Sequence, residues 1–466
     1  MKPPSENAHI AVLNWRDGSH PRAGGAELYC ERVAAELVEQ GVAVTYLTAR
    51  VAGRASVEER NGFRIIRMGG GLTVYLAVLI WLWRHRHEID GVVDSQNGIP
   101  FFAPLAVGKR VPVALLIHHV HQEQFRQYFG WPMSVVGRWL EKSGTARVYG
   151  RRPIVTVSPS SRHAIRRELG LPGTIFIAPC GIDLPPADDM TRSPEPRIVC
   201  VTRLVPHKRI ELVLDAVAEA RHRIPGLELH LVGDGPHRAT LAAHVERLGI
   251  NDCTVLHGRV GDAEKTALMR TAWMTVSASA GEGWGLSLVE ASALGVPVVA
   301  LRVPGVQDAV RNGRTGLLVD RASRLSDAIV DMAERLADQS EADRWKARSH
   351  AWAAGFHWWR TAQQIRYVLE AESWRIARDA PDRRGACDVA TLVELSGTVP
   401  ALEHLRRMTR RTDSWSTRGG GTVVGLLHNA DEIDALNVLH RLGLAEQPGI
   451  RVDLRVVRPH DLLRYA

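Results

Sequence analysis

Short apolar runs alternate with longer amphipathic segments along most of the chain. Residues 9–15 (HIAVLNW) predict a strand, and residues 26–41 predict an amphipathic helix that ends at Gly41. Further strands are predicted, mostly separated by helices, at VAVTYLTA, FRIIRM, DGVVDSQ, VPVALLIHH and PIVTVS. This alternation predicts one α/β domain built on a largely parallel sheet.

The same alternation starts again near Arg197. Strands are predicted, most of them separated by helices, at RIVCVTRL, LELHLVGDG, CTVLHGRV, MTVSASA, VPVVAL and GLLVD. The segment 180–196 between the two patterns is rich in Pro and Asp, which is typical of a hinge. Two α/β domains joined by a hinge predict a cleft between the carboxyl ends of their sheets.

The chain ends in a part with a different pattern. A last helix is predicted over 357–376, and the tail holds a strand, a helix and a strand (GTVVGLLHN, DEIDALNVLHRLG, RVDLRVVRP) without a catalytic pattern. Because three elements bury little surface alone, we expect the tail to pack on another surface. We predict an N-terminal domain at 1–185, a second domain at 186–376, a linker at 377–388 and a small α/β extension at 389–466.

Composition narrows the possible classes of protein. The chain has 466 residues, a net charge of +8 and a pI of about 9.5, which indicates either a polyanionic partner or no functional bias. Its five cysteines form no C-x-x-C pair, so we expect a reducing cytosol rather than a disulfide framework or a zinc site. The N-terminal residues lack the apolar core of a signal peptide, and no apolar run reaches the roughly 18 residues of a membrane span.

The stretch 281–290, GEGWGLSLVE, predicts a glycine loop that opens a helix. The helix is expected to begin near Gly285, so the free backbone amides of Gly285, Leu286 and Ser287 lie at its N-terminus. Free amides at a helix N-terminus bind phosphate. This end of the helix is therefore a candidate diphosphate site.

Two carboxylates lie on either side of that helix end. Glu290 lies more than a turn inside the helix, where its oxygens can accept hydrogen bonds from ribose hydroxyls. Glu282 precedes the helix and reaches the other end of a ligand. This spacing fits a nucleotide-sugar, although a capping carboxylate beside an exposed helical glutamate is the structural alternative.

The segment EGWGLSLVE resembles the E-x7-E motif of the family-four retaining glycosyltransferases, which have the GT-B fold. Other segments resemble the family in the same order: NWRDGSHPRAGGAELY, VSPSSRHAIRRELGLPGTIFIAPCGID, VTRLVPHKRIELVLDAV, LHLVGDGPHR, LHGRV and GVQDAVRNGRTGLLV. The resemblance covers about residues 8–375 and leaves out the tail. It implies an α/β fold of the GT-B type, with two Rossmann-like domains facing a cleft.

The resemblance assigns roles to the carboxylates and to two cations. It implies that Glu290 holds the ribose hydroxyls, Glu282 bonds the transferred sugar, and Arg203 and Lys208 pair with the diphosphate. The residues agree, because a cation at a helix start opposes the helix dipole and needs another reason to be there. Lys208 is one of only six lysines among 59 basic residues. Two exposed surface cations remain the alternative.

The resemblance also implies contacts from the N-terminal domain. Gly24 and Gly25 let the backbone approach the phosphates or the acceptor, and His118, which ends a strand, contacts the donor sugar. His119 stands where the family commonly has Asp, which bears on the local polar network and on acceptor choice, and His121 is a weaker candidate. No acidic or cysteine partner supports a metal at these histidines.

In the second domain, Gly283 belongs to the predicted glycine loop, and Gly233 and Arg259 are expected near the base. The N-terminal loop that contains Gly24 and Gly25 has no G-x-G-x-x-G fingerprint, so a dinucleotide cofactor is not predicted. We find no D-x-D motif, so no metal is expected, and Arg203, Lys208 and the helix N-terminus must meet the charge of the leaving diphosphate. The predicted catalytic residues are Glu282, His118, Arg203 and Lys208.

The family is retaining, which implies front-face displacement with the leaving phosphate accepting the proton of the acceptor. The donor is expected to be GDP-mannose or a UDP-hexose, without a further cofactor. The acceptor is expected to be a glycan, a polyol or a lipid-linked molecule in cell-envelope or polysaccharide synthesis. A GT-B epimerase, an NAD-dependent enzyme and a basic nucleic-acid-binding or scaffold protein are the alternatives, and no nucleic-acid-binding motif supports the last.

Two segments fit an interfacial surface that docks on anionic lipid. LTVYLAVLIWLWRHRHEID (72–90) has an apolar core followed by Arg and His, and 125–152 mixes aromatic residues with Arg and Lys. For the first segment, a helix buried against the sheet is the alternative. We therefore expect a cytoplasmic protein that is peripheral on the inner face of the plasma membrane.

Overall fold

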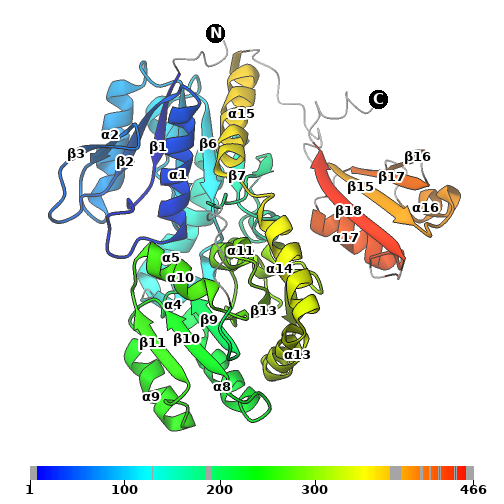
Figure 1. Ribbon diagram of the computed structural model, residues 1–466. Helices are drawn as coiled ribbons and strands as arrows, with labels where there is room; N and C mark the ends of the chain where they lie inside the picture. The colour runs from blue at the N-terminus through cyan, green and yellow to red at the C-terminus, as the bar shows by residue number, and fades with distance from the viewer. Residues whose placement is uncertain are drawn as a thin grey trace.

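The computed structural model describes residues 8–128, 130–171, 173–183, 192–377, 390–409, 413–418, 421–428, 430, 432–445, 447 and 449–457. Figure 1 shows an N-terminal body in blue and cyan, a second body in green to yellow, and a small C-terminal module in orange and red. The long helix α15 (Trp358–Ala377) follows the second body in the chain but packs against α1 (Gly25–Glu39) of the first.

The N-terminal body is built on one eight-stranded sheet with the order β3-β4-β2-β1-β5-β6-β7-β8. All neighbouring strands are parallel except β3 and β4, which confirms the predicted α/β class. The sequence analysis missed β3, because its residues VEER are half-exposed and lack an apolar alternation. The strands are β1 (His9–Leu13), β2 (Ala43–Thr48), β3 (Val57–Arg60), β4 (Phe63–Arg67), β5 (Gly91–Gln96), β6 (Val113–Ile117), β7 (Ile154–Thr156) and β8 (Ile175–Ile177).

Helices cover both faces of this sheet, and the inner strands β5 and β6 are buried along their whole length. Strands that are buried on both faces have continuous apolar runs, which explains why VPVALLI is easily recognised. The helical segments are α1, α2 (Thr73–His85), α3 (Pro104–Val107), α4 (Gln122–Tyr128), α5 (Trp131–Trp139), the π-helix η1 (Leu140–Gly144), α6 (Thr145–Tyr149), α7 (Pro159–Ala164) and the π-helix η2 (Ile165–Leu169).

The second body contains the six strands that the sequence predicts, all in parallel pairs. Two three-stranded sheets, β11-β10-β9 and β12-β13-β14, are joined by a bridge between Ile198 and Met274. The strands are β9 (Arg197–Val201), β10 (Glu228–Val232), β11 (Thr254–Gly258), β12 (Thr275–Ser277), β13 (Val298–Leu301) and β14 (Gly316–Val319). The combined order 3-2-1-4-5-6 is that of a Rossmann fold, and ligands bind such sheets where the order reverses.

The helical segments of this body pack on both sides of its sheet. They are η3 (Pro206–Lys208), α8 (Ile210–Ala220), α9 (Arg238–Leu248), α10 (Asp262–Arg270), α11 (Leu286–Ala293), α12 (Val306–Ala309), η4 (Ala322–Arg324), α13 (Leu325–Ala337) and α14 (Gln339–Ala353). The two bodies share one apolar core cluster, which runs from β1 and α1 through α11 to α15. They therefore stand in direct contact, with the carboxyl ends of β6 and β12 on either side of the junction.

The C-terminal module differs from the prediction of three elements. It has the order β15 (Ala390–Gly397), α16 (Leu402–Met408), β16 (Ser414–Arg418), β17 (Thr422–His428), α17 (Glu432–Arg441) and β18 (Ile450–Val457). Its antiparallel sheet β16-β17-β15-β18 gives the βαββαβ topology of ferredoxin-like folds. The central strand β15 was missed because polar residues interrupt its sequence ATLVELSG, which is neither continuously apolar nor strictly alternating.

The module has an apolar core of its own, formed around Val393, Leu395, Trp415 and Leu439, so the expectation that it buries little by itself is wrong. It also contacts the rest of the protein, because α17 lies against α7. Apart from Ala377, the predicted linker 377–388 lies outside the described residues. The boundaries at 1–185, 186–376 and 389–466 remain predictions.

In the part of the chain that the structure describes, no helix has both the length and the apolar character needed to cross a membrane.

Candidate active site

A small cavity lies where the Rossmann order of the second body reverses, between the carboxyl ends of β9 and β12. Lys208, Glu282 and Ser287 line it together with backbone and side chains of both strands. Ser287 belongs to the first turn of α11, and Gly285 is the residue before the helix. The predicted glycine loop, the helix N-terminus and Lys208 thus meet at one place, and Arg203 lies outside the lining of this cavity.

Glu282 and Lys208 form an ion pair across this cavity. Both side chains are largely buried, with exposed fractions of 18% and 15%. Burial raises the pKa of the Glu282 carboxyl, but Lys208, Ser279 and His207 outweigh it and hold the pKa below its usual range. Glu282 is therefore an ionised acceptor of hydrogen bonds, as a residue that binds sugar hydroxyls must be.

Glu290 lies one turn along α11 and faces Lys265 of α10. The Lys265 ammonium is 3.8 Å from a Glu290 oxygen and 3.0 Å from Asp262. Burial raises the pKa of Glu290, and Lys265 opposes this rise. Sequence reasoning missed Lys265, although its occurrence in a chain with six lysines was an available signal.

The N-terminal loop reaches over the second body from the other side. Arg259 donates a hydrogen bond of 3.3 Å to the carbonyl of Pro21. Gly24 lies close to the guanidinium of Arg203, since a Cβ at Gly24 would be 3.8 Å from its central carbon. The structure thus brings Arg203, Arg259 and Gly24 to the same cleft, whereas a Cβ at Gly25 would meet nothing within 4 Å.

Steric constraints explain why glycine occupies two of the predicted positions. Gly285 has φ of +83°, which lets the chain turn into α11. Gly233 has φ of +134°, and a Cβ there would lie 1.9 Å from the carbonyl oxygen of Thr202. Close packing between β9 and β10 therefore accounts for Gly233 without a ligand.

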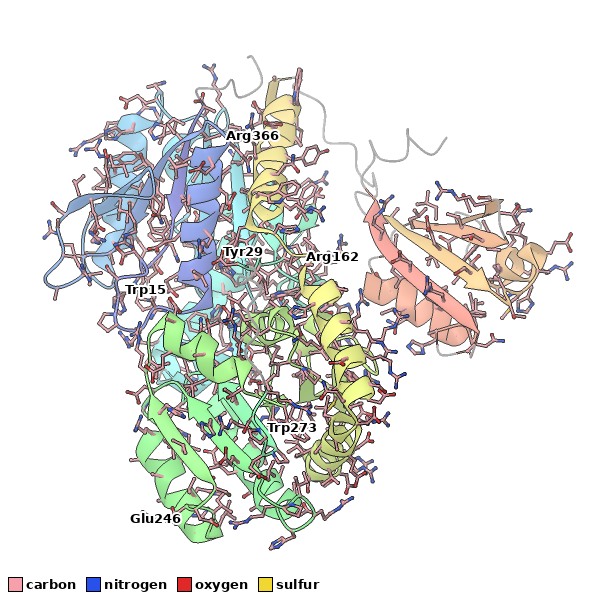
Figure 2. All side chains as sticks on the ribbon, viewed as in Figure 1. Trp15, Tyr29, Arg162, Glu246, Trp273 and Arg366 are labelled. Carbon is pink, nitrogen blue, oxygen red and sulfur yellow. The ribbon has the colours of Figure 1, made fainter. Side chains whose placement is uncertain are left out.

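The histidines after β6 form the opposite wall. Tyr29 of α1, labelled in Figure 2 near the junction of the two bodies, contacts His118 edge-on with ring centroids 5.1 Å apart. The rings of His119 and His121 are 3.9 Å apart. Burial lowers the pKa of His118 to about 3 and that of His121 to about 4, with neighbouring histidines adding to the effect at His118. Both imidazoles are therefore neutral near pH 7.

These buried neutral histidines predict acid sensitivity. Because their folded-state pKa values lie below the ordinary 6.5, the stability they contribute is complete above pH 6.5 and is lost as the pH falls. As the pH falls from 6.5 to 5.5, each histidine is expected to lower the free energy of unfolding by about 1 kcal/mol. Thermal unfolding across this range checks the prediction. In the variant His121→Asn, the melting temperature should fall less steeply with falling pH. An unchanged pH dependence would contradict the prediction.

One contact between the two bodies lies directly beneath the site. The Ser161 hydroxyl of α7 is 3.0 Å from the His118 carbonyl and 3.2 Å from the Gly283 carbonyl. A Cβ at Gly283 would lie 2.6 Å from the same His118 oxygen, so only glycine permits this approach. The predicted loop glycine therefore serves the contact between domains.

A second contact joins α7 to α12. The backbone amide of Ser160 donates to Asp308 at 3.1 Å, and Gln307 donates to the Ser160 hydroxyl at 3.1 Å. Sequence reasoning missed these residues, because their partners are more than 140 positions apart. The two contacts hold the His118 wall against the loop that carries Glu282.

Comparisons with known proteins agree with this geometry. The model of the family described as "Glycosyltransferase Family 4" matches residues 23–185, and that described as "Glycosyl transferases group 1" matches residues 188–352. Sucrose-phosphate synthase from Thermosynechococcus elongatus superposes with a TM-score of 0.63 and 21% identity, over 80% of this chain and 100% of that one. The fold and the site thus define a glycosyltransferase of the GT-B class.

Among curated proteins, the chain is 28% identical to the GDP-mannose-dependent alpha-(1-6)-phosphatidylinositol monomannoside mannosyltransferase of Mycolicibacterium smegmatis, over 64% of this chain and 82% of the relative. It is 32% identical to the D-inositol 3-phosphate glycosyltransferase of Acidothermus cellulolyticus, over 50% of this chain and 54% of the relative. The chain belongs to the GT-B glycosyltransferases that the two family models describe. The C-terminal module lies outside both models.

Proposed function

We propose that this glycosyltransferase moves mannose from GDP-mannose to a lipid-linked acceptor, with retention at the anomeric carbon and without a metal. The observation that carries the proposal is the Glu282–Lys208 pair beside the N-terminus of α11, with Glu290 one turn deeper. In a bound nucleotide-sugar, the sugar would lie at Glu282, the diphosphate at Lys208 and the N-terminus of α11, and the ribose at Glu290. GDP-mannose is favoured because the mannosyltransferase of M. smegmatis takes it.

In the proposed reaction, the cations and the free backbone amides of the site lie where negative charge develops. The acceptor oxygen attacks the anomeric carbon on the face from which the phosphate leaves, and the bond between that carbon and the phosphate oxygen breaks. The proton of the acceptor hydroxyl passes to the departing phosphate. Arg203, Lys208 and the amides of Gly285, Leu286 and Ser287 stabilise the negative charge that the diphosphate gains. Neutral His118 holds the sugar.

The direct test is transfer from radiolabelled GDP-mannose to phosphatidylinositol monomannoside in the presence of a chelator. We expect a mannosylated lipid whose new linkage has the α-configuration of the donor. If a product forms only with UDP-glucose, the donor is a UDP-hexose instead of GDP-mannose. A product with inverted configuration, or one that requires added metal, would contradict the proposed mechanism.

A lipid acceptor requires a surface that meets the membrane, and α5 provides one. Its side chains Trp131, Val135 and Trp139 are 83%, 49% and 51% exposed. Arg147 lies 6.0 Å from the Trp139 ring, so a cation accompanies the aromatic face. Exposed tryptophans beside cations are typical of helices that lie in the interface of anionic membranes.

Helix α2 has one buried face and one exposed face. Val74, Val78 and Leu82 are buried against the sheet, as the structural alternative expected. The opposite face exposes Leu72 by 73% and Leu76 by 64%, together with Trp83. We propose that α5, and with it this face of α2, places the protein on the cytoplasmic face of an anionic membrane.

Vesicle binding checks the membrane proposal. We expect the protein to co-sediment with phosphatidylglycerol vesicles at low salt and to dissociate in high salt. Replacing Trp131 and Trp139 with alanine should weaken binding at least about tenfold, because each aromatic side chain loses a large apolar contact area. Trp359→Ala, which removes a 45% exposed tryptophan of α15, is the matched control. Equal losses from both variants, or no binding by the wild type, would contradict the proposal.

A further inference from the structure

Glu141 is a buried carboxylate that the donor site does not use. It lies in η1, the π-helical turn that connects α5 to α6, and its exposed fraction is 0%. Helical turns of this wide type are rare and are often found at functional sites. A charged side chain is buried only where it is well paired, so its partners indicate its role.

Its two short hydrogen bonds come from the segment that follows β6, while Gln96 at the end of β5 and Arg138 of α5 lie nearby. One carboxylate oxygen accepts a hydrogen bond of 2.6 Å from the backbone amide of His121 and lies 3.6 Å from the ring nitrogen Nδ1. The other accepts a hydrogen bond of 2.6 Å from Gln122. Glu141 thus fixes both the backbone and a side chain at the distal end of residues 118–122, which we call the histidine loop.

Gln122 continues this connection to α5. Its amide nitrogen donates to the carbonyl of Arg138 at 3.2 Å, and its amide oxygen accepts from the Arg138 guanidinium at 3.2 Å. Helix α5 carries the exposed tryptophans of the proposed membrane face. A continuous set of hydrogen bonds therefore joins that face to the histidine loop.

The proximal end of the loop is held by a different residue. Ser161 donates to the carbonyl of His118, which is independent of Glu141. His119 lies between these two held positions, with its ring tilted against that of His121, and it faces the charges of Glu282 and Lys208 across the cleft. Loss of Glu141 should therefore release His119 and His121 while His118 keeps its place.

Several charges act on Glu141 from the surrounding elements. Burial raises its pKa to about 7, and the His121 amide, Gln122, Gln96 and Arg138 stabilise the ionised form. Its neighbours with titratable groups are His121 in the loop, Arg138 on α5 and Glu168 on η2. The donors, which come from the loop, α5 and the end of β5, offset only part of the rise that burial causes.

We propose that Glu141 is a positioning residue for the acceptor: it holds the distal end of the histidine loop, which forms the acceptor side of the cleft, and it links this loop to the exposed face of α5. The proposal rests on the proposed transfer to a lipid-linked acceptor. Donor binding depends on the second body and on His118, so it should not require Glu141.

The substitution Glu141→Gln tests the assignment. It preserves the size of the side chain but puts an NH2 group against one of two donors, so one hydrogen bond to the loop is lost. We expect the KM for phosphatidylinositol monomannoside to rise about tenfold, while the Kd for GDP-mannose changes less than twofold. Hydrogen exchange of a peptide that covers residues 118–122 should become faster. Glu168→Gln, an exposed glutamate on the neighbouring turn, is the matched control and should change none of the three.

The outcomes separate this inference from the proposed function. Equal changes in the acceptor KM and the donor Kd would show a general structural role and overturn the assignment. An unchanged exchange rate at residues 118–122 would overturn it as well, whatever the activity. If the wild type shows no transfer while Glu141→Gln still accelerates exchange, the hold on the loop stands and the acceptor role fails together with the proposed function.

Discussion

Replacing Lys208 with methionine is expected to lower kcat/KM for the donor by about 100- to 1,000-fold. The methionine keeps most of the apolar stem but removes the ammonium that forms the ion pair with Glu282. In the proposed reaction the departing diphosphate gains negative charge, and Lys208 is the largely buried cation among the residues that line this pocket. Steady-state kinetics with GDP-mannose measure the effect.

Lys109→Met is the matched control for this prediction. Lys109 is exposed in the loop before β6, so the same substitution should leave kcat/KM within about twofold. Far-UV circular dichroism and thermal unfolding show whether Lys208→Met remains folded. A folded variant that loses less than tenfold would contradict the assignment of Lys208 to the leaving group.

Substitutions of the two motif glutamates are expected to change different kinetic quantities. Glu282→Ala should lower kcat by about 100-fold and leave the donor Kd within a fewfold, because its contact to the sugar strengthens as the transition state forms. Glu290→Ala should raise the donor Kd by about 10- to 100-fold with a smaller effect on kcat, because its ribose contact is the same before and during transfer. Both variants remove a carboxylate that pairs with a lysine, which makes them a matched pair.

Titration calorimetry with GDP-mannose and single-turnover transfer separate the two effects. The calorimetric measurement reports Kd without chemistry, and the single turnover reports the transfer step. Equal and small effects of the two substitutions on both quantities would refute this division of roles.

The fold could be predicted wherever a strand lies between two layers of helices. Buried runs such as VPVALLI and VPVVAL are apolar throughout, so they stand out against the amphipathic helices between them. The prediction failed at β3, which lies at the edge of the sheet and is polar, and at β15, whose sequence ATLVELSG is neither continuously apolar nor strictly alternating. In both cases tertiary pairing, rather than the local pattern, creates the strand.

The candidate site could be predicted only as far as residues adjacent in sequence define it. Glu282 and Glu290 lie on one loop and helix, so their spacing already indicates a ligand with two hydroxyl-rich ends. Lys208 joins Glu282 from 74 positions away, and Ser161 reaches Gly283 across 122 positions. The first pairing depends on packing within the second body and the second on packing between the two bodies, and no local pattern reveals either.

The most direct test of the central claim is a thermal-shift panel of UDP-, GDP-, ADP- and dTDP-linked sugars without metal, with Glu290→Ala as the control. We expect GDP-mannose to raise the melting temperature of the wild type, since a ligand that binds only the folded state stabilises it. The variant should show a much smaller shift at the same concentration. No shift with any nucleotide-sugar, or an equal shift in the wild type and Glu290→Ala, would contradict the proposed donor site.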